Sequence, residues 1–92
     1  MSSSFRFPLG QVVAAPGALA LLQAHAVSPA ELLARHQAGD WGEVPPDDAQ
    51  ANELAVAHGD RLLSCYRVGG ERLWIITEAD RAATTLLLPS EY

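Results

Sequence analysis

The amino-acid sequence predicts an α+β fold, in which two or three N-terminal helices pack on one face of a C-terminal three-stranded antiparallel meander. Helical spacing of apolar residues is confined to positions 16–59, whereas positions 61–88 follow the two-residue period of strands. The dipeptide Gly69-Gly70 interrupts this second region and is typical of a two-residue hairpin turn. Helices followed by strands indicate an α+β domain, and we expect residues 1–92 to form a single domain.

Each predicted helix starts with a proline near its first position, where the missing N–H costs nothing: Pro16, Pro29 and Pro46. The second helix has the clearest start signal, because Ser28 is placed to cap it and Glu31 to complete a capping box. Asp47 and Asp48 fall in the first turn of the third helix, where negative charge is favourable. We expect that helix to end at Gly59.

Three strands are predicted in the C-terminal third, within "RLLSCYRV", "RLWIIT" and "TTLLLP". Residues 5–13 are expected to be extended and to form at most a short edge strand, because Pro8 and Gly10 interrupt them. Residues 1–4 are expected to be frayed. The sheet should lay one face on the helices and leave the other open.

The net charge of −5, reached without a single lysine, argues against a nucleic-acid-binding surface. Acidic residues concentrate between positions 40 and 60, where no arginine occurs. This segment either meets a basic partner or is simply a solvated face. On the first reading, the candidate partner-binding acids are Asp40, Glu43, Asp47 and Asp48.

Cysteine and histidine usage excludes several site classes. Cys65 is the only cysteine, and His25, His36 and His58 lack zinc-ligand spacing, so we predict no disulfide, metal site or cofactor. The apolar stretch after Arg6 resembles a signal peptide but is broken by Gln11, Pro16 and Gly17, and it is too short to span a membrane. The prediction is a cytoplasmic protein. The histidines lie near helix ends, where such side chains are often at the surface.

The open face of the predicted sheet is the candidate site. It would gather Arg67, Arg72 or Trp74 and a threonine of the last strand, Thr84 or Thr85, a set able to hold a phosphate or stack on a base. The alternative is that these are ordinary exposed strand residues. Arg81 is expected to pair with Glu78 or Asp80 and to order the turn. No catalytic motif accompanies these residues.

Four stretches carry a resemblance to a known family: "FPLGQVVAAPGAL", "LLARHQAGDWG", "NELAVAHGDRLLSCYRV" and "LWIITEADRAATTLLLPSEY". From Phe5 to Tyr92 the chain resembles the small plasmid-related proteins of bacterial plasmids and integrative conjugative elements. Some of these are labelled type I restriction endonuclease subunit M, a role for which a chain of 92 residues holds neither the fold nor the motif. Ala15 and Pro45 depart from the family pattern, since a capping Thr or Asp is expected there.

A more remote analogy is to the barnase, colicin and toxin ribonucleases, which also place helices before an antiparallel meander. The matching positions would be Tyr66, Arg67, Thr77, Arg81, Thr84 and Thr85. This is analogy at the level of the fold alone. The acidic charge weighs against it.

Three functional hypotheses follow. The preferred one is a non-enzymatic accessory protein of a mobile element that works by protein–protein contact, with Trp74 and the acidic residues as partner-binding candidates and a host defence or restriction component as partner. The second is a small ribonuclease-like toxin or nucleotide-binding module that uses Arg67, Arg81, Thr84 and Thr85. The third is a homodimer formed through an apolar sheet edge or face.

Overall fold

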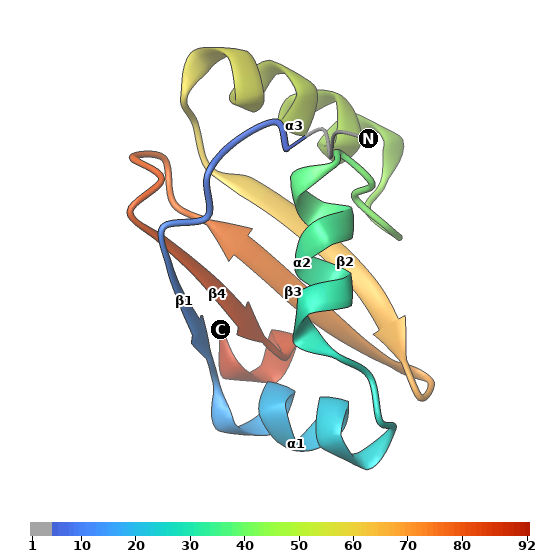
Figure 1. Ribbon diagram of the computed structural model, residues 1–92. Coiled ribbons are helices and arrows are strands. Elements are labelled where there is room, and N and C mark those ends of the chain that lie inside the picture. The colour runs from blue at the N-terminus through green and yellow to red at the C-terminus, as the bar shows by residue number, and fades with distance from the viewer. Residues whose placement is uncertain (1–4) are drawn as a thin grey trace, which may run out of the picture.

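The computed structural model describes residues 5–92, so the prediction of frayed residues 1–4 lies outside the described residues. The α+β class is confirmed (Figure 1). In chain order the elements are β1 (Gln11–Ala14), α1 (Pro16–Ala24), α2 (Pro29–Gln37), α3 (Pro46–His58), β2 (Leu62–Val68), β3 (Glu71–Thr77), β4 (Ala83–Leu87) and the short 3₁₀ helix η1 (Pro89–Glu91).

The sheet has four strands in the order β1-β4-β3-β2, so the prediction of a three-stranded antiparallel meander is wrong in strand number and direction. β2, β3 and β4 do form an antiparallel meander, but β1 adds to it parallel to β4. The Gln11 N–H donates to the Ala82 carbonyl at 3.0 Å and the Ala15 N–H to the Leu86 carbonyl at 2.8 Å. Pro8 and Gly10 precede β1 instead of interrupting it, which is why the strand can form.

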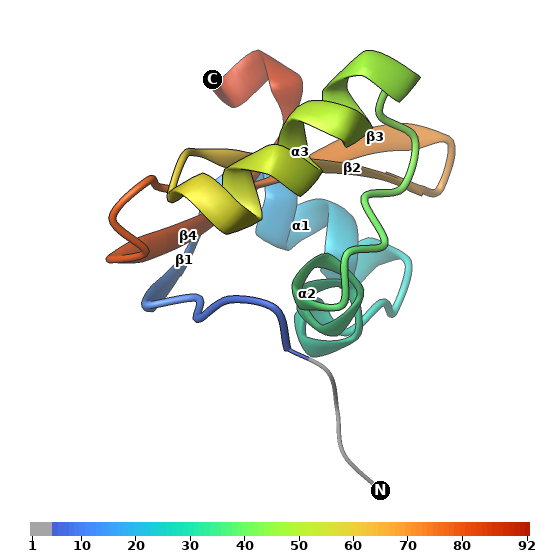
Figure 2. The same ribbon diagram turned by 90° about the horizontal axis from the view of Figure 1, so that it is seen from above.

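Helices α1 and α2 cover one face of the sheet, while α3 lies across the end of the sheet near the start of β2 (Figure 1). Seen from above, η1 lies on the side opposite α1 and α2 (Figure 2). The main apolar core lies between the sheet and the first two helices and contains Ala18, Leu21, Leu22, Leu32, Tyr66, Val68, Leu73, Ile75 and Leu86. A second cluster of Phe7, Trp41, Ala55 and Leu62 joins α3 to the sheet.

The helices begin with their prolines as predicted, but no side chain caps any of the three from its N-cap position. The capping box predicted for Ser28 and Glu31 is therefore wrong: the Glu31 N–H donates to the Ser28 carbonyl at 3.1 Å. Ala15 and Pro45 hold the other two N-cap positions and have no side chain able to cap.

The outer edge of β2 forms hydrogen bonds with groups outside the sheet. The outer edge of β2 is occupied, because the Asn52 side chain donates to the Leu63 carbonyl at 2.7 Å and accepts from the Leu63 N–H at 3.1 Å. Two residues further on, the Cys65 N–H donates to the Trp41 carbonyl, and the Cys65 carbonyl accepts from the Glu43 N–H. A side chain and a loop thus stand in for a fifth strand on this edge.

Candidate functional site

Side chains on the sheet alternate between the face covered by α1 and α2 and the opposite face, which we call the open face. The cross-strand register pairs Trp74 with Cys65 and with Leu87, and Ile76 with Leu63 and with Thr85. Residues in such pairs share a face. The open face therefore carries Leu63, Cys65, Arg67, Arg72, Trp74, Ile76, Thr85 and Leu87.

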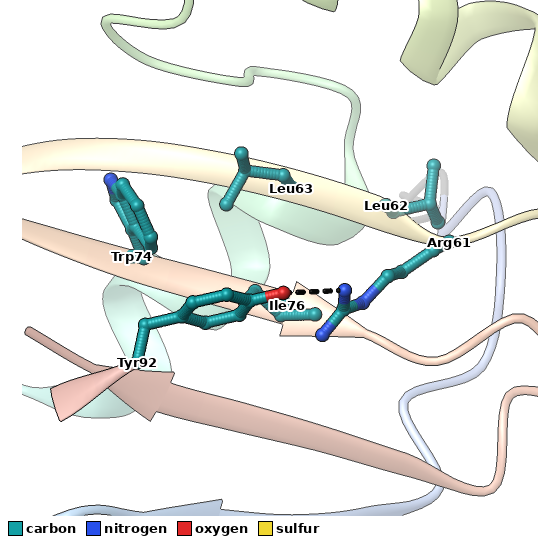
Figure 3. Close-up of a pocket in the computed structure, with 6 residues that line it drawn as sticks. All are labelled: Arg61, Leu62, Leu63, Trp74, Ile76 and Tyr92. Atoms are coloured by element: carbon teal, nitrogen blue, oxygen red, sulfur yellow. Dashed lines mark hydrogen bonds between the residues drawn. The ribbon is translucent and has the colours of Figure 1, made fainter. Parts of the chain in front are cut away.

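A hollow of about 290 Å³ lies on the open face (Figure 3). Its lining is formed by Arg61, Leu62, Leu63, Trp74, Ile76 and Tyr92. Most of these side chains are apolar, and the two aromatic rings are 5.7 Å apart between centroids at an interplanar angle of 72°, an edge-to-face contact. The shape and lining suit an apolar or aromatic side chain from another molecule.

Arg61 forms the polar rim of this hollow. Its guanidinium lies 5.5 Å from the centre of the Tyr92 ring, and its Nη1 donates to the Tyr92 hydroxyl at 2.9 Å (Figure 3). Its Nε lies 3.6 Å from a carboxylate oxygen of Glu78. These contacts place a cation and a phenol side by side at the mouth of an otherwise apolar hollow.

Tyr92 is held over the open face by its neighbour Glu91. The Glu91 carboxylate accepts from the backbone N–H groups of Gly17 at 2.7 Å, Ala18 at 3.1 Å and Leu88 at 2.9 Å. Two of these donors belong to the first turn of α1, where unpaired N–H groups favour an anion. The same hydrogen bonds lower the pKa of Glu91. A residue near the chain's C-terminal end thus caps the first helix and anchors one wall of the hollow.

The predicted catalytic candidates do not come together. Arg67 and Thr85 lie on the open face, but Thr84 is fully buried on the covered face. Arg81 lies in the β3–β4 turn at φ +61°, and its guanidinium donates to the carbonyls of Asp60 at 2.6 Å and Ala55 at 2.9 Å. It therefore ties the turn to the end of α3.

Arg81 was expected to pair with Glu78 or Asp80. It does order the turn, but through backbone carbonyls: its Nη1 donates to the Glu78 carbonyl at 3.1 Å. The Asp80 carboxylate is engaged instead by the N–H of Ala82 at 2.9 Å.

The residues that the ribonuclease analogy singled out also lie on opposite faces of the sheet. Tyr66 and Thr77, like Thr84, are buried on the covered face, whereas Arg67 is exposed on the other. Arg72, which was predicted to share the open face with Arg67, is the cross-strand neighbour of that residue. Two groups on opposite faces of a sheet cannot act on one substrate.

Two of the four predicted partner-binding acids form ion pairs with arginines from outside the acidic segment. Asp40 pairs with Arg35 at 2.7 Å, and Glu43 pairs with Arg67 at 3.1 Å. Hydrogen bonds from these guanidinium groups lower the pKa of each carboxyl. Asp47 and Asp48, in the first turn of α3, form no ion pair within residues 5–92.

A buried chain of polar side chains, missed by sequence reasoning, crosses the covered face. His36 is fully buried, contrary to the expectation of a surface position. Its Nδ1 lies 2.5 Å from Ser64 Oγ and its Nε2 lies 2.9 Å from Thr77 Oγ1. Thr77 in turn contacts Thr84 at 2.8 Å, and the Thr84 hydroxyl donates to the Leu9 carbonyl at 2.7 Å.

These contacts determine where the protons lie. Thr84 uses its one hydrogen on Leu9, so Thr77 must donate to Thr84 and must accept from His36 Nε2. Nε2 of His36 therefore carries a proton, and in the neutral imidazole Nδ1 accepts from Ser64. Burial, aided by the nearby charge of Arg81, lowers the pKa of His36 to about 4.

Ser64 and His36 have the contact of a nucleophile and its base, but both are sealed from solvent. The rings of Phe7 and Trp41 pack edge-on against the imidazole at centroid distances of 5.1 and 5.7 Å. A substrate has no access to the pair. The chain of hydrogen bonds satisfies polar groups in the core, and its only sequence signal was the place of His36 beside Leu32 and Leu33.

No helix within residues 5–92 is long and apolar enough to cross a membrane. In the same part of the chain, no three His, Cys, Asp or Glu side chains lie where they could share a metal ion. The chain matches no protein-family model, no curated protein and no solved structure. A function can therefore be inferred only from the geometry of the open face.

Proposed function

We propose that the protein is a non-enzymatic binding module that docks a partner protein on the open face, with Trp74 at the centre of the contact. The observation that supports this most is the hollow beside Trp74, an apolar depression on the sheet face that α1 and α2 leave free (Figure 3). Sheet faces with apolar side chains are normally covered, and a contiguous apolar depression on the surface is typical of an interaction site.

The chemistry of the hollow favours a protein partner. Trp, Tyr and Arg are the side chains that most often dominate binding energy at protein interfaces, and Trp74, Tyr92 and Arg61 meet here. Burial of apolar area contributes about 25 cal/mol per Å² removed from water, so one inserted side chain would be worth a few kcal/mol. One apolar side chain of the partner, inserted into the hollow, thus contributes a substantial part of the binding free energy.

The acidic segment has a smaller role in this proposal. Asp40 and Glu43 hold their own arginines in place, whereas Asp47 and Asp48 remain exposed at the start of α3. Together with the net charge of −5, these two carboxylates favour approach of a basic partner. They act on the rate of encounter more than on the final affinity.

The resemblance to plasmid-related proteins supports a proposal for where this binding takes place and for the kind of genetic element that encodes the protein. We place the protein in the cytoplasm as an accessory factor of a mobile element, with a host defence or restriction component as its partner. Catalysis is not part of the proposal, because Arg67 and Thr85 are separated from Thr84 by the sheet.

Capture from bacterial lysate, followed by mass spectrometry, tests the proposal. We expect the wild-type protein to retain a partner, and Trp74→Ala to lose it. Leu54→Ala is the matched control, because Leu54 is an apolar side chain, 55% exposed, on α3 and outside the hollow. A partner that Trp74→Ala retains as well as Leu54→Ala does would contradict the proposal.

A further inference from the structure

The outer edge of β1 differs from the occupied outer edge of β2. Gln11 and Ala15 direct their N–H groups toward β4, and because strand residues alternate, Val13 does the same. The N–H and C=O groups of Val12 and Ala14 therefore point away from the sheet. In the part of the chain that the structure describes, no helix or strand lies beyond β1 on this side (Figure 1). Within residues 5–92 these backbone donors and acceptors have no hydrogen-bond partner.

The side chains around this edge are apolar and exposed. Val12 is 44% exposed and Val13 is 46% exposed, and Leu19, in the first turns of α1, is 41% exposed. The strand reads QVVA and carries no charge, although the whole chain has a charge of −5. Natural proteins usually protect an open edge with charges, proline or a covering loop. β1 has none of these within Gln11–Ala14.

We infer that β1 pairs antiparallel with β1 of a second copy of the chain. The edge is complementary to itself: Val12 of one copy faces Ala14 of the other, and each such pair exchanges two N–H···O bonds. Val13 then lies opposite its own equivalent at the two-fold axis, in a non-hydrogen-bonded position. The uncharged strand allows two acidic chains to meet there without direct repulsion.

The geometry of this pairing has a consequence for the open face. Antiparallel strands in one continuous sheet are related by a two-fold axis perpendicular to that sheet, so the two open faces lie on the same side. The dimer would have an eight-stranded sheet that presents two Trp74 hollows together. A partner with two docking segments would gain affinity from this arrangement. The pairing itself is independent of the function proposed above.

A cysteine at position 13 tests the inference directly. Non-hydrogen-bonded pairs bring Cα atoms to about 4.5 Å, within the range of about 4.4–6.8 Å found in disulfides. Val13→Cys should therefore form a covalent dimer under mild oxidation. The native Cys65 is buried and will not compete. Leu54→Cys, at an apolar position of α3 that is somewhat more exposed than Val13, should cross-link far less.

Sedimentation over a concentration series provides the second arm. We expect a weak dimer, because four residues a side form a small interface, and Val13→Lys should make it monomeric by placing like charges directly opposite each other. Leu54→Lys should keep the dimer, and so should Trp74→Ala, which affects only the proposed partner. A wild-type protein that is monomeric throughout, or Val13→Cys that cross-links no better than Leu54→Cys, would overturn the inference and leave the edge to a strand of another protein.

Discussion

His36 Nδ1 lies 2.5 Å from Ser64 Oγ in a pair from which solvent is fully excluded. The chain of hydroxyl groups beyond it places a proton on Nε2 of His36, and burial keeps the imidazole neutral. A protonated His36 would require Ser64 to reverse its hydrogen bond, and it would bring a positive charge into an apolar core. The stability of the fold should therefore depend on this proton.

The pH dependence of unfolding should reveal His36. The pKa of His36 is about 4 in the folded protein against 6.5 when unperturbed. Between pH 6.5 and pH 4, the imidazole is therefore protonated in the unfolded state but not in the native state. Stability should be fully present above pH 6.5 and should fall by up to about 3 kcal/mol as the pH approaches 4. Urea denaturation at several pH values measures this loss.

His36→Gln should flatten that dependence, whereas His58→Gln, which alters an exposed residue of α3, should preserve it. NMR titration of the wild-type imidazole offers an independent check if His36→Gln does not fold. An imidazole that titrates at the usual histidine value would contradict the assignment.

The threonines at 84 and 85 form a matched pair on one strand. Thr84→Val removes the hydroxyl that donates to Leu9 and accepts from Thr77, so it should cost about 1–3 kcal/mol of unfolding free energy. Thr85→Val changes a half-buried residue of the open face and should stay within about 0.5 kcal/mol. Thermal or chemical denaturation separates the two. If both variants lost the same unfolding free energy, the buried chain of hydrogen bonds would not contribute to stability as argued.

Asn52 should be needed to close the β2 edge. Asn52→Leu keeps a side chain of similar size but leaves the N–H and C=O of Leu63 without partners, at a cost of about 1–3 kcal/mol. Hydrogen exchange at the Leu63 amide should accelerate, and the protein should aggregate more readily because the edge is freed. Unchanged protection of that amide would show that another group takes over.

Arg81 should act as a structural residue of the β3–β4 turn. Arg81→Ala loses the hydrogen bonds to Asp60 and Ala55 while keeping the positive φ of +61° that alanine tolerates poorly. Arg81→Gly loses the same bonds but relieves the backbone, so it should be more stable than Arg81→Ala by about 1 kcal/mol. Denaturation midpoints report the order. The reverse order would mean that the turn relaxes out of the left-handed region.

Local signals in the sequence were enough to predict the helices and the central hairpin. Proline at the first helical position marks each helix start, and Gly69 and Gly70 have the positive φ values of 56° and 83° that their hairpin turn requires. Both features depend on backbone conformation within a few residues. For that reason they can be recognised without knowledge of the rest of the fold.

The parts that were missed depend on contacts between distant residues. β1 pairs with β4 some seventy positions away, and no short motif predicts such a pairing. Glu91 caps α1 from the other end of the chain, and His36 finds its two hydroxyl partners, Ser64 and Thr77, only after the sheet has formed. Trp74 was predicted as a partner-binding residue, which stays a prediction, whereas the positions of Arg61 and Tyr92 beside Trp74 could be seen only in the fold.

Site-specific photo-cross-linking tests the central claim, that partners dock on the open face, most directly. A photoreactive residue at position 85, on the open face beside Ile76, should cross-link to the partner captured from lysate, and Trp74→Ala in the same protein should abolish that product. The same probe at position 54 on α3 should yield no such product. A partner that cross-links from position 54 and not from position 85 would contradict the account.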